Sequence, residues 1–194
     1  MQRGLSLVEA MVTLLIFSIV GQVALTLVVS GVRIWSREVA AVELQNDLTG
    51  AKSIVLDELI TAGFSPDGAA SGKTAFRAVT AGTVSDRVQF VADIDSDGVS
   101  ELVTYAVADG RLERSRQRWD GSGWEVPTTD VVGWNVQSFT VTFFDAAGST
   151  LPAAAVVSAG TSSARTVNVS VVAGKPVRGE VIARAFFGSG TFRN

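Results

Sequence analysis

Residues 1–32 read MQRGLSLVEAMVTLLIFSIVGQVALTLVVSGV, and the expected fold of the chain follows from this segment. No charged residue occurs from Ala10 to Val32. A helix of about 23 residues is about 34 Å long, close to the hydrocarbon thickness of a bilayer. The stretch therefore predicts a membrane-spanning helix, and a plain anchor or an uncleaved signal sequence would share this property.

Two features differ from an ordinary secretory signal. The only basic side chain before the apolar run is Arg3, and a small residue, Gly4, precedes the run instead of following it. In addition, Glu9 lies near the start of the apolar helix. A carboxylate costs on the order of 3 kcal/mol at the centre of a bilayer and less near its surface, so we expect Glu9 to have a partner.

The stretch Gly4-Leu5-Ser6-Leu7-Val8-Glu9 resembles the class III leader of type IV pilins and type II secretion pseudopilins. The resemblance implies cleavage by a prepilin peptidase between Gly4 and Leu5, followed by N-methylation of Leu5. Glu9 then takes the place of the glutamate that is the fifth residue of the mature protein. Two departures are visible: Leu5 stands where Phe is usual, and the helix has Gly21 but no proline.

The resemblance also implies that Glu9 is an assembly residue. In a filament core its carboxylate would pair with the N-terminal ammonium of Leu5 on a neighbouring subunit, because an unpaired buried carboxylate is costly. The alternative is that Glu9 only favours the helix N-terminus through the helix dipole, an effect worth under about 1 kcal/mol.

The family resemblance implies a division of the chain and a set of partners. Residues 1–4 would be the leader, 5–32 the transmembrane and filament-core helix, 33–63 its amphipathic second half, and 64–194 an exported β-rich head. The chain would reside in the bacterial inner membrane with a single pass, and then in a pilus or pseudopilus. Its partners would be other pilin or pseudopilin subunits, the prepilin peptidase, an inner-membrane assembly platform and, before assembly, membrane lipid. Nucleic acid would be a partner only in a DNA-uptake pilus.

The helical pattern continues beyond the apolar run. Apolar residues recur every three or four positions, at Val39, Leu44, Leu48, Ala51, Val55, Leu59 and Ala62. Gly63 and the turn Ser65-Pro66-Asp67-Gly68 then stop the pattern. We predict one long helix from Leu5 to Ala62, and two helices broken near Ser30-Gly31 or Gly50 are the alternative.

The remainder alternates as strands do. The predicted strands are 87–92, 101–107, 112–119, 134–145, 166–172 and 180–187. Turns are predicted at Asp109-Gly110, at 120–123, at 147–149 and at 174–176, and a surface loop at 153–164. A run of hairpins favours an antiparallel sheet with its apolar face on the helix. The predicted fold class is α+β, a pilin-like long helix packed on an antiparallel β-sheet.

One hairpin carries a second, weaker resemblance. Tyr105 and Val107, the Asp109-Gly110 turn, and Leu112 with Arg114 resemble a hairpin of J-type pseudopilins and W-type minor pilins. The match covers about a dozen residues, and an amphipathic hairpin with this turn could produce much of it. It favours a minor, tip-associated subunit over a shaft subunit.

The segment Asp93-Ile94-Asp95-Ser96-Asp97-Gly98-Val99-Ser100-Glu101 predicts a Ca²⁺ site. Acids at alternate positions before a glycine resemble the start of an EF-hand loop, with Val99 offering its carbonyl. The expected ligands are Asp93, Asp95, Asp97, Val99 and Glu101. The twelfth loop position is Thr104 rather than Glu, and strands flank the loop, so a true EF-hand is not expected. A solvated acidic turn without metal is the alternative.

Composition bears on the remaining classes of protein. The 194 residues include no Cys and no His, which removes thiolate nucleophiles, zinc–thiolate sites and the commonest general base. The four Trp residues could suggest a ligand surface, but packing is their more common role, with Trp124 the best candidate for exposure. A net charge of −3 gives no electrostatic argument for nucleic acid. No Walker loop or nucleophile elbow is present, and we predict that the chain is not an enzyme.

The sequence therefore predicts a structural minor subunit of a type IV pilus or a type II secretion pseudopilus. The alternative is a membrane-anchored, exported calcium-binding module that does not polymerise.

Overall fold

The computed structural model of the chain describes residues 7–67, 76–79, 87–159 and 164–192. It divides into two compact units, Met1–Ala40 and Ala41–Asn194, and each is described here by itself. The predicted fold class is confirmed: a long N-terminal helix, apolar in its first half, packs with its second half on antiparallel strands.

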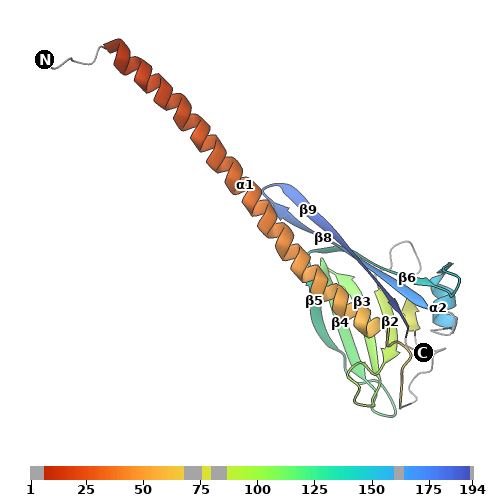
Figure 1. The fold of residues 1–194 in the computed structure, drawn as a ribbon. Helices are drawn as coiled ribbons and strands as arrows, with labels where there is room; N and C mark the ends of the chain where they lie inside the picture. The colour runs from red at the N-terminus through yellow and green to blue at the C-terminus, as the bar shows by residue number, and fades with distance from the viewer. Residues whose placement is uncertain (1–6, 68–75, 80–86, 160–163, 193–194) are drawn as a thin grey trace. The chain divides into compact units, whose positions relative to one another are not determined.

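Helix α1 spans Leu7–Leu59 (Figure 1). Ser30, Gly31 and Gly50 are all helical, so the alternative of two helices is wrong. In the first unit the apolar side chains of α1 are exposed, among them Leu7 at 77% and Phe17 at 77%. By length and composition, this part of α1 is apolar enough to cross a membrane.

The part of α1 in the second unit buries the predicted stripe. Five side chains on this face of α1 are almost wholly buried: Leu44, Leu48, Ala51, Val55 and Leu59. Ala62, just beyond the end of α1, is buried as well. Val39, which the spacing placed in the stripe, is instead exposed. α1 ends at Leu59, and the turn that follows it includes Gly63, which has a φ of 88° and donates its N–H to the Val91 carbonyl at 2.8 Å. Glycine suits this left-handed position because it has no Cβ.

The strands form two sheets rather than the single sheet that the sequence predicted. The first has five antiparallel strands in the order β1-β2-β3-β4-β5. These strands are β1 (Phe76–Val79), β2 (Arg87–Ala92), β3 (Glu101–Ala108), β4 (Arg111–Arg118) and β5 (Thr128–Trp134). The turn at Asp109-Gly110 is confirmed, with φ of 49° and 72°, as a two-residue type I′ hairpin requires.

The second sheet has the order β7-β6-β8-β9 and is also antiparallel. Its strands are β6 (Val136–Phe144), β7 (Thr150–Leu151), β8 (Thr166–Val177) and β9 (Glu180–Thr191). Asn135, with a φ of 57°, separates β5 from β6 and so divides what the sequence suggested was one strand from Trp134. A positive φ is sterically tolerable for Asn.

Three further predictions need correction. β8 runs through the predicted turn at 174–176, because Pro176 pairs with Val181, and the chain reverses at Arg178-Gly179 instead. The predicted surface loop at 153–164 contains a short helix, α2 (Ala153–Ala159). β1, β5 and β7 were not predicted. β1 and β7 are short, and β5 is largely exposed. None of these three strands therefore has a clear alternation of apolar residues.

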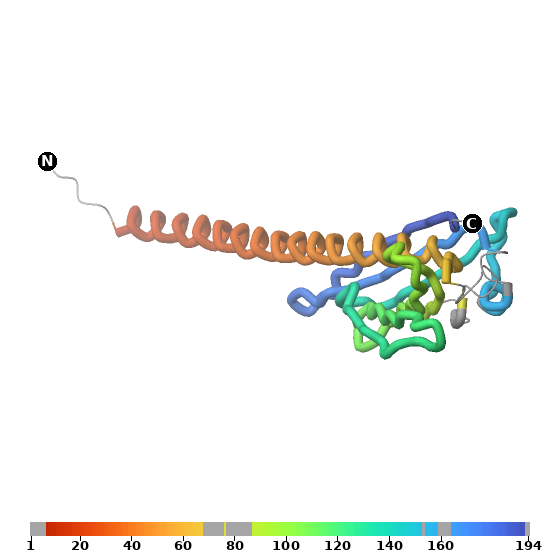
Figure 2. Tube along the Cα trace, turned by 90° about the horizontal axis from the view of Figure 1, so that it is seen from below, coloured from red at the N-terminus to blue at the C-terminus, as the bar shows by residue number. Residues whose placement is uncertain are grey.

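The core lies between the two sheets and residues 41–59 of α1. It contains Phe76, Phe90, Tyr105, Phe139 and Phe143, each almost wholly buried. β8 and β9 run along this part of α1 (Figures 1 and 2), where a Cβ on Gly188 would come within 3.0 Å of Lys52 Cδ. None of the four Trp side chains is in the core: Trp35 and Trp134 are exposed, and Trp119 and Trp124 contact each other edge to face at 5.0 Å.

Candidate functional site

The N-terminal site is only partly described. Gly4 and Leu5, the predicted cleavage and methylation positions, lie outside the described residues. Glu9 lies in the first turn of α1 and is exposed, among the exposed apolar side chains Leu7, Val8, Met11 and Val12. Its backbone carbonyl accepts a hydrogen bond of 2.7 Å from Thr13 Oγ1. No basic side chain in the described ranges pairs with its carboxylate. Glu9 is therefore a carboxylate on an apolar, exposed helix surface.

The acidic loop connects β2 to β3, and its backbone is sharply turned. Ser96 and Gly98 have φ of 61° and 88°. The bend predicted at Gly98 is confirmed, whereas nothing in the sequence pointed to the strained position of Ser96. Asp93 accepts backbone hydrogen bonds from Asp97 at 3.2 Å and from Gly98 at 3.0 Å. The Asp93 carboxylate thus holds the turn closed.

The loop brings together three of the predicted ligands. Asp93, Asp95 and Glu101 each offer a carboxylate oxygen, and these oxygens lie within 4.8 Å of one another. Asp93 and Glu101 are buried, and Asp95 is exposed. Oxygen ligands on a turn of this kind suit a hard cation such as Ca²⁺.

Asp97 lies apart from these three carboxylates. Its Oδ2 forms an ion pair of 2.5 Å with Arg118 on β4, and its Oδ1 accepts the Val99 N–H at 2.9 Å. Strand pairing places Arg118 opposite Glu101, which brings its guanidinium to the loop. The four predicted carboxylates therefore divide into a group of three and one that is paired with arginine, and the role of the Val99 carbonyl stays a prediction.

The electrostatics of the loop centre on Glu101. Burial is the main cause that raises the pKa of this carboxyl to about 7, and the charges of Asp95, Asp97 and Asp93 add to it. The backbone hydrogen bond from Ile94 opposes this increase. The Ile94 N–H donates to Glu101 Oε2 at 3.0 Å. Crowded carboxylates disfavour the ionised form of Glu101, and a bound cation would favour it.

A segment beyond α1 supports the loop. Asp67 accepts hydrogen bonds from the backbone N–H and the hydroxyl of Ser100, at 2.7 and 2.6 Å. The Asp93 N–H donates to the Phe64 carbonyl at 2.8 Å. The sequence identified Asp67 only as part of a helix-stopping turn, and its contact with Ser100 spans too many residues for a local pattern to predict.

The hairpin with the second resemblance carries a polar network that the sequence did not predict. Tyr105 and Arg114 are paired across β3 and β4, and both bind Glu58 of α1 at 2.5 Å. Burial, together with the charge of Glu58, raises the pKa of the Tyr105 hydroxyl, so it remains protonated and donates. Arg114 also contacts Asp130 of β5 at 3.2 Å. The network fastens α1 to the first sheet.

Comparison with known proteins bears on the N-terminal residues and on the fold of the chain. Residues 1–21 match the family model of the prokaryotic N-terminal methylation motif. A type IV-like pilin from Thermus thermophilus has a similar structure, with a TM-score of 0.53 and 14% sequence identity, over 77% of this chain and 96% of that one. A search of the curated proteins found no match. The chain therefore carries the N-terminal methylation motif of prokaryotic type IV pilins and has a type IV pilin-like fold.

Proposed function

We propose that the chain is a subunit of a pilus-type filament, processed after Gly4, methylated on Leu5 and assembled through its N-terminal helix. The observation that carries the proposal is the methylation motif in residues 1–21, which overlaps the start of a helix whose apolar surface is exposed. Such a surface needs lipid before assembly and neighbouring helices after it. Other pilin-like subunits, a prepilin peptidase and an assembly platform in the inner membrane are the proposed partners.

Glu9 is the proposed assembly residue. Its carboxylate lies on the apolar helix surface without a basic partner among the described residues. When neighbouring helices exclude water, the Leu5 ammonium of the next subunit would compensate this charge, and methylation would keep the positive charge. The pairing would also fix the axial register between subunits.

Mass spectrometry of the native product and an assembly assay test this function. The product should lack residues 1–4 and carry one added methyl group. Glu9→Gln should still insert into the membrane but should enter filaments at least about tenfold less well, because the amide cannot compensate a buried ammonium. Glu38→Gln, which removes an exposed charge from the same helix, is the matched control and should assemble normally.

Two results would contradict the proposal. Retention of residues 1–4 in the native product would leave a plain membrane anchor, the alternative in which the head is exported but never polymerises. Normal incorporation of Glu9→Gln would remove the pairing role while leaving processing intact.

A minor, tip-associated position is the finer proposal. It rests on the hairpin resemblance, and Tyr105 and Arg114 of that hairpin both contact Glu58. Immunogold labelling of filaments should place the chain at one end. Regular labelling along the shaft would contradict a minor role. The kind of filament that carries the label, a pilus or a secretion pseudopilus, would show which assembly contains the chain.

The acidic loop is proposed as a Ca²⁺ site with Asp93, Asp95 and Glu101 as its side-chain ligands. The support is the approach of their carboxylate oxygens to within 4.8 Å. Ca²⁺ should raise the melting temperature of the full chain in detergent. Asp95→Asn should reduce that increase, whereas Asp109→Asn, at an exposed turn where Asn fits a φ of 49°, should keep it. The absence of any increase at millimolar Ca²⁺ would leave a solvated acidic turn.

A further inference from the structure

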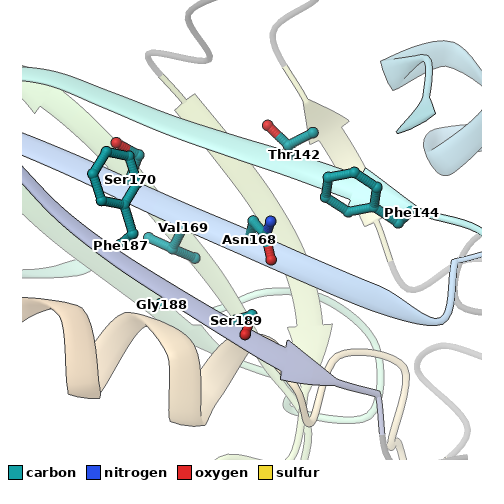
Figure 3. Close-up of a pocket in the computed structure, with 8 residues that line it drawn as sticks. All are labelled: Thr142, Phe144, Asn168, Val169, Ser170, Phe187, Gly188 and Ser189. Carbon is teal, nitrogen blue, oxygen red and sulfur yellow. The ribbon is translucent and has the colours of Figure 1, made fainter. Parts of the chain in front are cut away.

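The outer face of the second sheet has a hollow of about 440 Å³ (Figure 3). This volume is within the range of small-ligand sites, roughly 300–1,000 Å³. Thr142 and Phe144 of β6, Asn168 and Ser170 of β8, and Phe187 and Ser189 of β9 line it. The core-facing side chains of the same strands, such as Val141 and Val167, are buried. The hollow is therefore on the solvent face of the sheet.

The polar side chains of the hollow lie in a row across three strands. Asn168 pairs with Thr142 on one side and with Ser189 on the other. Strands lie about 4.8 Å apart, so this row extends for about 10 Å. In the next register position Ser170 pairs with Phe187, and Figure 3 shows the Phe187 ring beside Ser170. One side of the row thus has an aromatic ring.

The lining is uncharged but rich in hydrogen-bonding groups. It contains neither Asp, Glu, Lys nor Arg. No side-chain hydrogen bond joins Thr142, Asn168, Ser170 or Ser189 to another described residue, so their hydroxyl and amide groups are available to a ligand. Phe187 is 73% exposed and adds little to the core. Its ring is therefore accessible to a ligand in the hollow.

These features match one kind of ligand. A pyranose ring has an apolar C–H face that packs on an aromatic side chain, and neutral hydroxyl groups that bind amides and hydroxyls. A charged ligand would find no counter-ion in the lining, and an apolar segment would leave the row of polar groups without partners. We propose that this hollow binds a neutral oligosaccharide, in addition to the role of the chain in a filament.

Binding to defined sugars tests this inference on the full chain, in micelles of a detergent whose headgroup is not a sugar. Isothermal titration with cellohexaose and chitohexaose, two neutral hexasaccharides, should give saturable binding to at least one of them. Phe187→Ala should weaken that binding about tenfold, which is the loss expected for a stacked ring. Asn168→Ala should weaken sugar binding too, because the Asn168 amide lies at the centre of the row of polar side chains.

Val181→Ala is the matched control. Val181 is 60% exposed on the same edge strand and on the same face as Phe187, but it does not line the hollow. This variant should bind the sugar as the unchanged chain does. The inference is overturned if neither hexasaccharide binds at millimolar concentration, if Val181→Ala weakens binding as much as Phe187→Ala, or if the anionic tetragalacturonate binds more tightly. It is also overturned if Phe187→Ala abolishes a concentration-dependent dimer, because the occupant would then be a second copy.

Discussion

At the scale of single residues, the ion pairs Glu58–Arg114 and Glu43–Lys175, each between α1 and a strand, differ in burial. Glu58 binds Tyr105 and Arg114, and the Glu58 and Arg114 side chains are only 13% and 18% exposed. Glu43 pairs with Lys175, and these side chains are 54% and 40% exposed. A surface ion pair contributes about 0–1 kcal/mol, whereas a hydrogen bond to a buried charge is worth about 1.5–3 kcal/mol.

We predict that Glu58→Gln lowers the free energy of unfolding by about 2 kcal/mol, because the buried Tyr105 and the partly buried Arg114 lose a charged acceptor. Glu43→Gln should change it by less than about 1 kcal/mol. Urea denaturation of the full chain in detergent measures both. Equal effects of the two substitutions would contradict the importance of burial here.

Glu101 predicts a pH dependence of stability in the presence of a chelator. Burial and the charges of Asp95, Asp97 and Asp93 raise its pKa from 4.5 to about 7, although the Ile94 hydrogen bond opposes the increase. The folded chain therefore binds this proton more tightly than the unfolded chain does. The contribution to stability is therefore full below about pH 4.5 and is lost as pH rises to about 7.

The urea midpoint of the full chain should accordingly fall between about pH 5 and pH 7.5. Glu101→Gln retains an acceptor for the Ile94 N–H but does not titrate, so this variant should lose that part of the pH dependence. An identical pH profile in the two proteins would show that Glu101 titrates normally.

At the scale of elements, the close approach of β9 to α1 depends on glycine. A Cβ on Gly190 would lie 2.5 Å from Ile60 Cγ2, just beyond the end of α1. Ile60 is β-branched and has few rotamers with which to avoid the contact. Gly50, within α1, has no heavy atom near the position of an added Cβ.

We predict opposite effects for two glycine-to-alanine substitutions. Gly190→Ala should lower the free energy of unfolding by about 1–3 kcal/mol through overpacking. Gly50→Ala should raise it by about 0.5–1 kcal/mol, because alanine favours a helix. Thermal denaturation followed by circular dichroism measures both, and stabilisation by Gly190→Ala would show that β9 can move away from the helix without cost.

At the scale of the whole molecule, the buried side chains and the exposed apolar surface fall in different units. Apart from Ala40, every buried apolar residue of the described ranges lies in the second unit. The exposed apolar residues from Leu7 to Val32 lie in the first unit. The second unit thus contains a core of its own, and the first contains the surface that needs lipid or partner helices.

A fragment that begins at Arg33 should therefore be soluble without detergent and should unfold in a single cooperative transition. Size-exclusion chromatography and circular dichroism check this expectation. Aggregation of the fragment, or gradual loss of its signal on heating, would mean that residues before Arg33 are needed for the core.

Features that depend on neighbouring residues along the chain could be predicted from the sequence. The uncharged run before Arg33, the three- and four-residue spacing from Leu44 to Leu59, and the Asp109-Gly110 turn each follow from local geometry, and each predicted its element correctly. Gly98 marked the bend of the acidic loop for the same reason.

Long-range packing, in contrast, sets which of these elements contact one another. It divided the strands between two sheets at Asn135, paired Arg118 with Asp97 and so separated that carboxylate from the other three, and placed Glu58 beside Tyr105 and Arg114. It also formed the hollow beside Phe187. These contacts join residues far apart in the chain, and their energies depend on burial and distance, which no local spacing specifies.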